Sequence, residues 1–100
     1  QVYGVEIDKQ IIPSKLLLSQ NYPNPLNPTT TISYELPEAQ NITLQVFDIS
    51  GQLVETLYYG YKEAGYWDVK WNASTYSSGI YLYRLKADNF VDTKKMVLMK

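Results

Sequence analysis

Cysteine and histidine are both missing from this sequence of 100 residues. Without cysteine the chain can form no disulfide, carries no reactive thiolate and offers zinc no thiolate ligand. Without histidine it lacks the side chain that serves most often as a general base and as a transition-metal ligand. We therefore expect no catalytic residue, no metal site and no cofactor, and we predict that the chain is not an enzyme.

Clustered carboxylates are lacking as well. Asp48, Asp68, Asp88 and Asp92 lie in separate turns and strands of the predicted fold. None of them belongs to a calcium loop, in which acidic residues alternate ahead of a glycine. The acidic residues therefore indicate no metal or hydrolytic site.

Long apolar runs and an excess of one charge are also absent. No stretch approaches the ~20 apolar residues that a membrane-spanning helix needs. Nine basic residues against ten acidic ones give a formal net charge of −1, so the chain has no basic surface for nucleic acid. We expect neither a nucleic-acid partner nor membrane insertion.

Alternating apolar and polar residues are what the chain does have, and this period is typical of half-buried strands. The predicted strands cover residues 15–20, 29–36, 41–49, 52–59, 66–72, 80–87 and 90–99. A short helix is the alternative for 52–59, where the spacing is less regular. The pattern predicts an all-β fold, an immunoglobulin-like antiparallel β-sandwich of about seven strands. Residues 1–13 are predicted to be a linker or a loosely attached edge segment, and residues 14–100 the sandwich domain.

Aromatic residues are unusually frequent, with ten tyrosines and two tryptophans. Trp67 and Trp71 alternate in phase with Val69, which favours a place in the core for both rings. A second group of aromatic residues lies near predicted turns, where exposed rings can stack on a glycan or on a neighbouring domain. These candidates for glycan or domain contact are Tyr58, Tyr59, Tyr61, Tyr66 and Tyr76.

Three prolines alternate with asparagines and one leucine in residues 21–28 (NYPNPLNP). Proline fixes φ and removes a backbone donor, so this segment cannot be a central strand. It is either a ligand loop or a crossover between sheets. The turn chemistry of its prolines and asparagines favours the crossover.

The same loop carries a family resemblance. Residues 19–30 (SQNYPNPLNPTT) resemble the opening of the type IX secretion C-terminal sorting domains (type A), which are related to the immunoglobulin-like domain of flagellar hook-capping proteins. Leu26 stands where that family usually has phenylalanine. Four later segments resemble the family's motifs in the same order: 46–54 (VFDISGQLV), 64–72 (AGYWDVKWN), 78–85 (SGIYLYRL) and 94–100 (KKMVLMK).

The resemblance implies a sorting module at the end of a larger exported protein. Its partners would be the type IX secretion machinery, whose outer-membrane translocon recognises the domain, and the upstream domains of the same polypeptide. The protein would be secreted or held at the cell surface, and would pass through the periplasm. The final strand is the family's most direct recognition element, which here consists of Lys95, Met96, Val97, Leu98, Met99 and Lys100.

An exposed edge on that strand would let a receptor strand pair with it. Lys94 and Lys95 would then protect the edge from unspecific pairing. Two other functions remain open. One is a carbohydrate-binding accessory module of a secreted polysaccharide-degrading enzyme, which the turn-borne tyrosines favour. The other is a passive immunoglobulin-like spacer.

Overall fold

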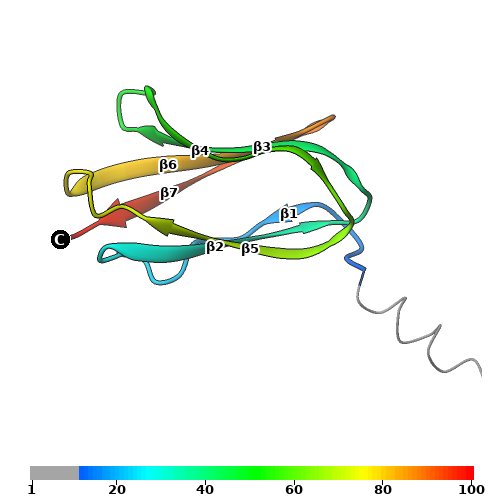
Figure 1. Ribbon diagram of the computed structural model, residues 1–100, viewed down its shortest axis with the longest axis horizontal. Coiled ribbons are helices and arrows are strands. Elements are labelled where there is room, and N and C mark those ends of the chain that lie inside the picture. The colour runs from blue at the N-terminus through cyan, green and yellow to red at the C-terminus, as the bar shows by residue number, and fades with distance from the viewer. Residues whose placement is uncertain (1–11) are drawn as a thin grey trace, which may run out of the picture.

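Seven antiparallel strands form two sheets in the computed structural model, which describes residues 12–100 (Figure 1). The strands are β1 (Leu17–Leu18), β2 (Thr29–Leu36), β3 (Gln40–Asp48), β4 (Leu53–Lys62), β5 (Gly65–Asn72), β6 (Gly79–Ala87) and β7 (Phe90–Leu98). The three-stranded sheet has the order β1-β2-β5, and the four-stranded sheet has the order β4-β3-β6-β7. The predicted all-β sandwich is therefore confirmed. Most of the predicted segment 1–13 lies outside the described residues.

The core lies between the two sheets, and the alternation of the sequence determines which side chains enter it. In β2, β3 and β6 every second residue is buried, and the residues between them face solvent. The fully buried side chains with the largest volumes are Trp71, Tyr83, Leu18, Leu26, Ile32, Leu36, Ile42, Leu44, Leu85, Met96, Leu98 and Val46. Each sheet thus has one apolar inner face and one outer face, as expected for a sandwich.

β4 is a strand and not a helix, and it is longer than the sequence predicts. Its pairing with β3 shifts register between Leu44 and Gln45 and again between Val46 and Phe47. Each shift interrupts the two-residue period, which explains why the spacing of 52–59 is irregular. The strand continues to Lys62, beyond the predicted end at residue 59, so only Glu63 and Ala64 connect it to β5.

No helix long and apolar enough to cross a membrane is present between residues 12 and 100.

Candidate functional site

β7 is an edge strand of the four-stranded sheet, and its last residues are divided between the two faces. Met96 and Leu98 are fully buried in the core. Lys95 and Met99 are exposed and Val97 is partly exposed on the opposite side. In the folded domain a partner can therefore contact Lys95, Val97 and Met99, whereas Met96 and Leu98 hold the strand in place.

Lys100 and Lys94 both take part in contacts within the domain. The backbone N–H of Lys100 donates to Ser78 Oγ at 3.0 Å, and its ammonium donates to the carbonyl of Tyr76 at 2.7 Å. These bonds attach the end of the chain to the segment between β5 and β6. Lys94 lies 3.7 Å from the Asp92 carboxylate, an exposed ion pair of the kind that contributes little to stability.

The segment from Gln20 to Leu26 covers the outer edge of β7. Gln20 Nε2 donates to the carbonyl of Lys95 at 2.7 Å, and the N–H of Val97 donates to Asn24 Oδ1 at 3.0 Å. Leu26 then donates to the carbonyl of Val97 at 2.8 Å and accepts from the N–H of Met99 at 3.0 Å. The expectation of an open edge at this end of β7 is therefore wrong, because these outward backbone groups already have partners.

Buried contacts anchor the covering loop. Leu26 is completely buried. Asn21, also buried, donates from Nδ2 to Thr30 Oγ1 at 3.0 Å and to the carbonyl of Pro23 at 3.2 Å. The hydroxyl of Tyr83 donates to the carbonyl of Ser19 at 2.6 Å. The loop is thus anchored on both sides, but it is not the predicted crossover between sheets, because it joins β1 and β2, which pair within one sheet. Its cover over β7 was missed because no local pattern predicts a contact between residues about 70 positions apart.

The five candidate tyrosines do not form one surface. Tyr58 and Tyr76 are half-buried and pack against the core. The Lys62 ammonium lies 4.4 Å from the ring centre of Tyr58, and the Tyr76 hydroxyl donates to Glu55 Oε1 at 3.0 Å. The exposed rings are Tyr59 and Tyr61 on β4 and Tyr66 on β5, so they belong to different sheets.

The two tryptophans differ in burial. Trp71 is fully buried and its Nε1 donates to Glu55 Oε1 at 2.9 Å. Trp67 is only partly buried, and its ring lies 4.1 Å beneath the Lys62 ammonium. Both rings pack on the core side of β5, so neither is an exposed platform for a sugar.

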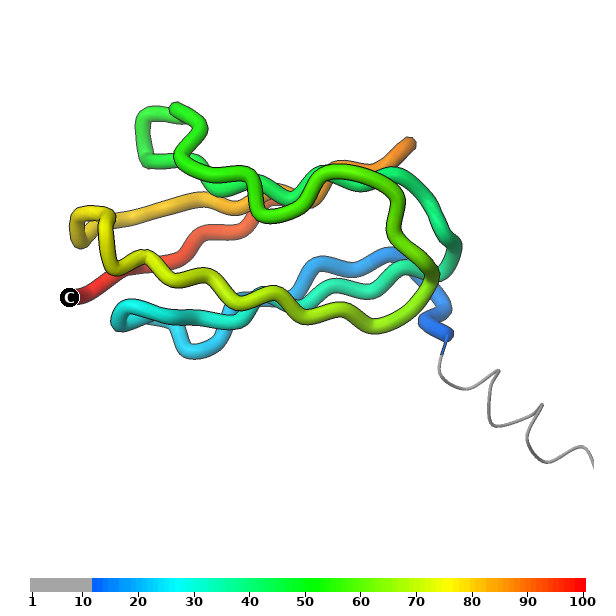
Figure 2. The backbone as a smooth tube through the Cα atoms, in the orientation of Figure 1, coloured from blue at the N-terminus to red at the C-terminus, as the bar shows by residue number. Residues whose placement is uncertain are grey.

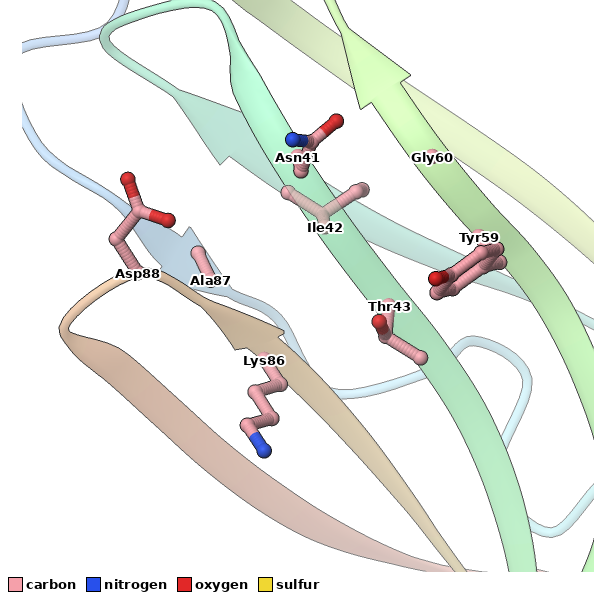
Figure 3. Close-up of a pocket in the computed structure, with 8 residues that line it drawn as sticks. All are labelled: Asn41, Ile42, Thr43, Tyr59, Gly60, Lys86, Ala87 and Asp88. Atoms are coloured by element: carbon pink, nitrogen blue, oxygen red, sulfur yellow. The ribbon is translucent and has the colours of Figure 1, made fainter.

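A shallow hollow of about 460 Å³ lies beside Tyr59, on the outer side of the four-stranded sheet (Figure 3). Its polar lining includes Asn41, Thr43, Lys86 and Asp88. The Tyr59 ring is 80% exposed. An exposed aromatic ring beside amide, hydroxyl and charged groups is an arrangement that suits a polar ligand with an apolar face, such as a sugar.

The carboxylates form no comparable site. Within residues 12–100, no group of three or more Asp or Glu side chains is placed to hold a metal ion. Asp48 instead organises the β3–β4 turn, since its Oδ1 accepts from the N–H and hydroxyl of Ser50 and from the N–H of Gln52. These hydrogen bonds, that of the Ser50 hydroxyl above all, lower the pKa of Asp48.

Comparison with known proteins gives a family and a fold. The family model for the secretion system C-terminal sorting domain matches residues 20–99. No curated protein matches the sequence. Among solved structures, dimeric latent PorU from Porphyromonas gingivalis is similar in fold, with a TM-score of 0.60 at 20% identity. The match covers 83% of this chain and 9% of the PorU chain, so it concerns one small part of that protein.

Proposed function

The chain belongs to the family of secretion system C-terminal sorting domains, the sorting signals of type IX secretion, and from this premise we propose how its surface is recognised. The folded domain presents the outward side chains of its last strand to the outer-membrane translocon. Lys95, Val97 and Met99 make the contact, and Lys100 fixes the end of the chain through its hydrogen bonds to Ser78 and Tyr76. Met96 and Leu98 contribute indirectly, because they hold the strand in the core.

The observation that carries this proposal is the division of β7 described above. The side chain of Met99 is 56% exposed, whereas that of Met96 is 0% exposed and that of Leu98 is 1% exposed. The backbone edge beside these residues is occupied by the loop from Gln20 to Leu26. Recognition at this end therefore uses side chains, and strand addition there would first require the loop to move.

A reporter secretion assay tests the proposal. The complete chain is fused behind a signal peptide and a reporter enzyme in a host with an active type IX system. We expect most of the reporter outside the cell, and we expect Lys95→Glu to retain it in the periplasm. Lys70→Glu is the matched control, because Lys70 is an exposed lysine on the outer side of β5. Equal export of both variants would contradict a role for Lys95.

The proposal also covers the route of the protein, the bounds of the sorting module, its cargo and its lack of catalytic activity. The family places the protein among those that pass through the periplasm to the cell surface or the medium. We propose that residues 14–100 are the sorting module, that upstream domains of the same polypeptide are its cargo, and that the module is not itself catalytic. The absence of histidine and cysteine from the sequence supports the last point.

Glycan binding is a second candidate function, and the hollow beside Tyr59 favours it. Affinity electrophoresis of the purified chain through gels that contain soluble polysaccharides tests it. Tyr59→Ala should abolish any retardation, and Tyr66→Ala, which removes an exposed ring on the other sheet, should leave it unchanged. If no polysaccharide retards the unmodified chain, this candidate is wrong.

A further inference from the structure

An apolar patch lies on the outer face of the four-stranded sheet, at the end where β7 finishes. Its members come from all four strands or from the turns directly beside them. They are Phe47, Ile49, Leu53, Ile80, Leu82, Val97 and Met99, and we call them the outer patch.

Strand register places these side chains on one face. Phe47 is paired with Leu53 on one side and with Leu82 on the other. Ile80 is paired with Val97 in the next row. Directly paired residues of neighbouring strands project to the same face of a sheet. Their neighbours along the strands, such as Val46, Tyr81 and Met96, are buried in the core, so the outer patch faces away from it.

The outer patch is open to solvent. Ile49 is 68% exposed, Leu53 49% and Ile80 39%, and Met99 is 56% exposed. Figure 2 shows the β3–β4 turn, the start of β6 and the end of β7 at the same end of the molecule. Contiguous exposed apolar surface of this kind is uncommon on a monomer and marks a surface that binds a partner.

The strands place only cations among the outward charged side chains of this face, whereas Asp88 lies in the turn after β6, beside the hollow at the other end. In the four strands, the charged side chains at positions that alternate onto the outer face are Arg84, Lys86 and Lys95. Lys95 is paired with Leu82, and the Arg84 guanidinium lies 4.5 Å above the Phe47 ring. A guanidinium held in this way keeps its N–H donors at its rim, in a geometry that suits a carboxylate.

We propose that the outer patch docks onto a protein surface of the secretion machinery that is apolar at its centre and carries carboxylates opposite Arg84 and Lys95. This inference rests on the proposed function and extends it. The partner would contact the end of the four-stranded sheet that carries the outer patch, and the outward residues at the end of β7 would form one border of this contact. An anionic membrane is the less suitable partner, because the chain has a net charge of −1 and only a few cations on this face.

Substitutions far from β7 test the inference in the same secretion assay. Ile49→Asp and Leu53→Asp each place a charge in the outer patch without touching the final strand. Each should lower the exported fraction about tenfold or more, as expected when a central apolar contact is lost. Tyr66→Asp is the control, because Tyr66 is 57% exposed on the other sheet, and it should export normally.

The outcomes separate this inference from the proposal on which it rests. If Lys95→Glu blocks export and both outer-patch variants export normally, the outer patch is not the docking surface, although the terminal strand is recognised. If all three export normally, the recognition proposal fails as well. Thermal melts establish that each variant is folded, and Ile49→Ser or Leu53→Ser replaces an aspartate variant that is not.

Vesicle binding tests the alternative partner. The purified chain is sedimented with vesicles of phosphatidylglycerol and phosphatidylcholine, and we expect it to remain in the supernatant. Sedimentation that Leu53→Asp abolishes would identify the outer patch as a membrane-binding surface and would overturn the proposal.

Discussion

Leu26 and Leu98 form a parallel β-bridge that joins the asparagine- and proline-rich loop to the edge of the last strand. Both side chains are buried, so the bridge is anchored in the core on each side. It connects the loop that leads into β2 of one sheet with β7 of the other. The segment that resembles the opening motif of the family thus closes one side of the sandwich and covers the strand that we propose is recognised.

Replacement of Leu26 tests the anchor. Because the side chain is fully buried, Leu26→Ala should lower the free energy of unfolding by about 2–5 kcal/mol. Leu17→Ala is the control, since Leu17 is 37% exposed on the short edge strand β1, and it should cost clearly less. Urea denaturation measures both, and equal losses would show that Leu26 is not a core residue.

The loop that covers the edge of β7 should protect the amide of Val97 from hydrogen exchange. Asn24 Oδ1 accepts a hydrogen bond from the N–H of Val97, so Asn24→Ala should speed hydrogen exchange at that amide. Loss of one such bond should reduce stability by about 0.5–1.5 kcal/mol. Asn27→Ala changes another exposed asparagine of the same loop and should leave the exchange of Val97 unchanged. Rapid exchange of Val97 in the unmodified chain would contradict the cover.

Trp71 and Trp67 should differ in their contribution to stability. Trp71→Ala removes a fully buried ring and the donor to Glu55, and it should destabilise the domain by about 3–5 kcal/mol. Trp67→Ala removes a partly buried ring and should cost less. A denaturant melt that shows no change for Trp71→Ala would mean that the ring is exposed, and would favour a glycan platform on β5.

Because two buried tyrosines have raised pKa values, we expect the free energy of unfolding to fall at alkaline pH. Burial raises the pKa of Tyr83 to about 12, and a nearby Asp92 carboxylate adds to the effect. Burial also raises the pKa of Tyr34 to about 12, with a smaller contribution from Tyr58. Since each phenol ionises more readily in the unfolded chain, the stability they provide is complete below pH 10 and is lost between about pH 10 and 12.

Urea midpoints at pH 9 and pH 11 measure this effect. The unmodified chain should lose about 1 kcal/mol for each of the two tyrosines over this interval. Tyr83→Phe should start from a lower stability, because it loses the hydrogen bond to Ser19, and should then fall less with pH. An equal fall in both proteins would show that Tyr83 does not titrate with folding.

Strand positions could be predicted closely because the chain alternates wherever a strand has one buried face. The predicted strand 29–36 is β2, and the predicted strand 41–49 corresponds to β3, in which Ile42, Leu44 and Val46 alternate into the core. The prediction for β4 was less accurate, because its bulges interrupt the alternation and the sequence of one strand does not show where they occur. The family motifs allowed the sorting role to be predicted, and the family match confirms it.

The arrangement of the recognition surface could not be obtained from the sequence. Leu26 is the only apolar side chain between Pro25 and Pro28, which hints at an anchor, but nothing local connects it to Leu98. The outer patch is likewise a product of register, since Phe47, Leu82 and Val97 meet only when β3, β6 and β7 are side by side. Pairing of strands far apart in sequence determines such surfaces.

The most direct test compares two exposed apolar residues on the outer side of the edge strand, Val91 in β7 and Met99 directly after it. Met99 and Val91 are similarly exposed, at 56% and 58%, but only Met99 lies at the end that we propose is recognised. In the secretion assay, a reporter that carries Met99→Asp should remain in the periplasm, and one that carries Val91→Asp should reach the outside. Normal export of the folded Met99→Asp protein would contradict the account.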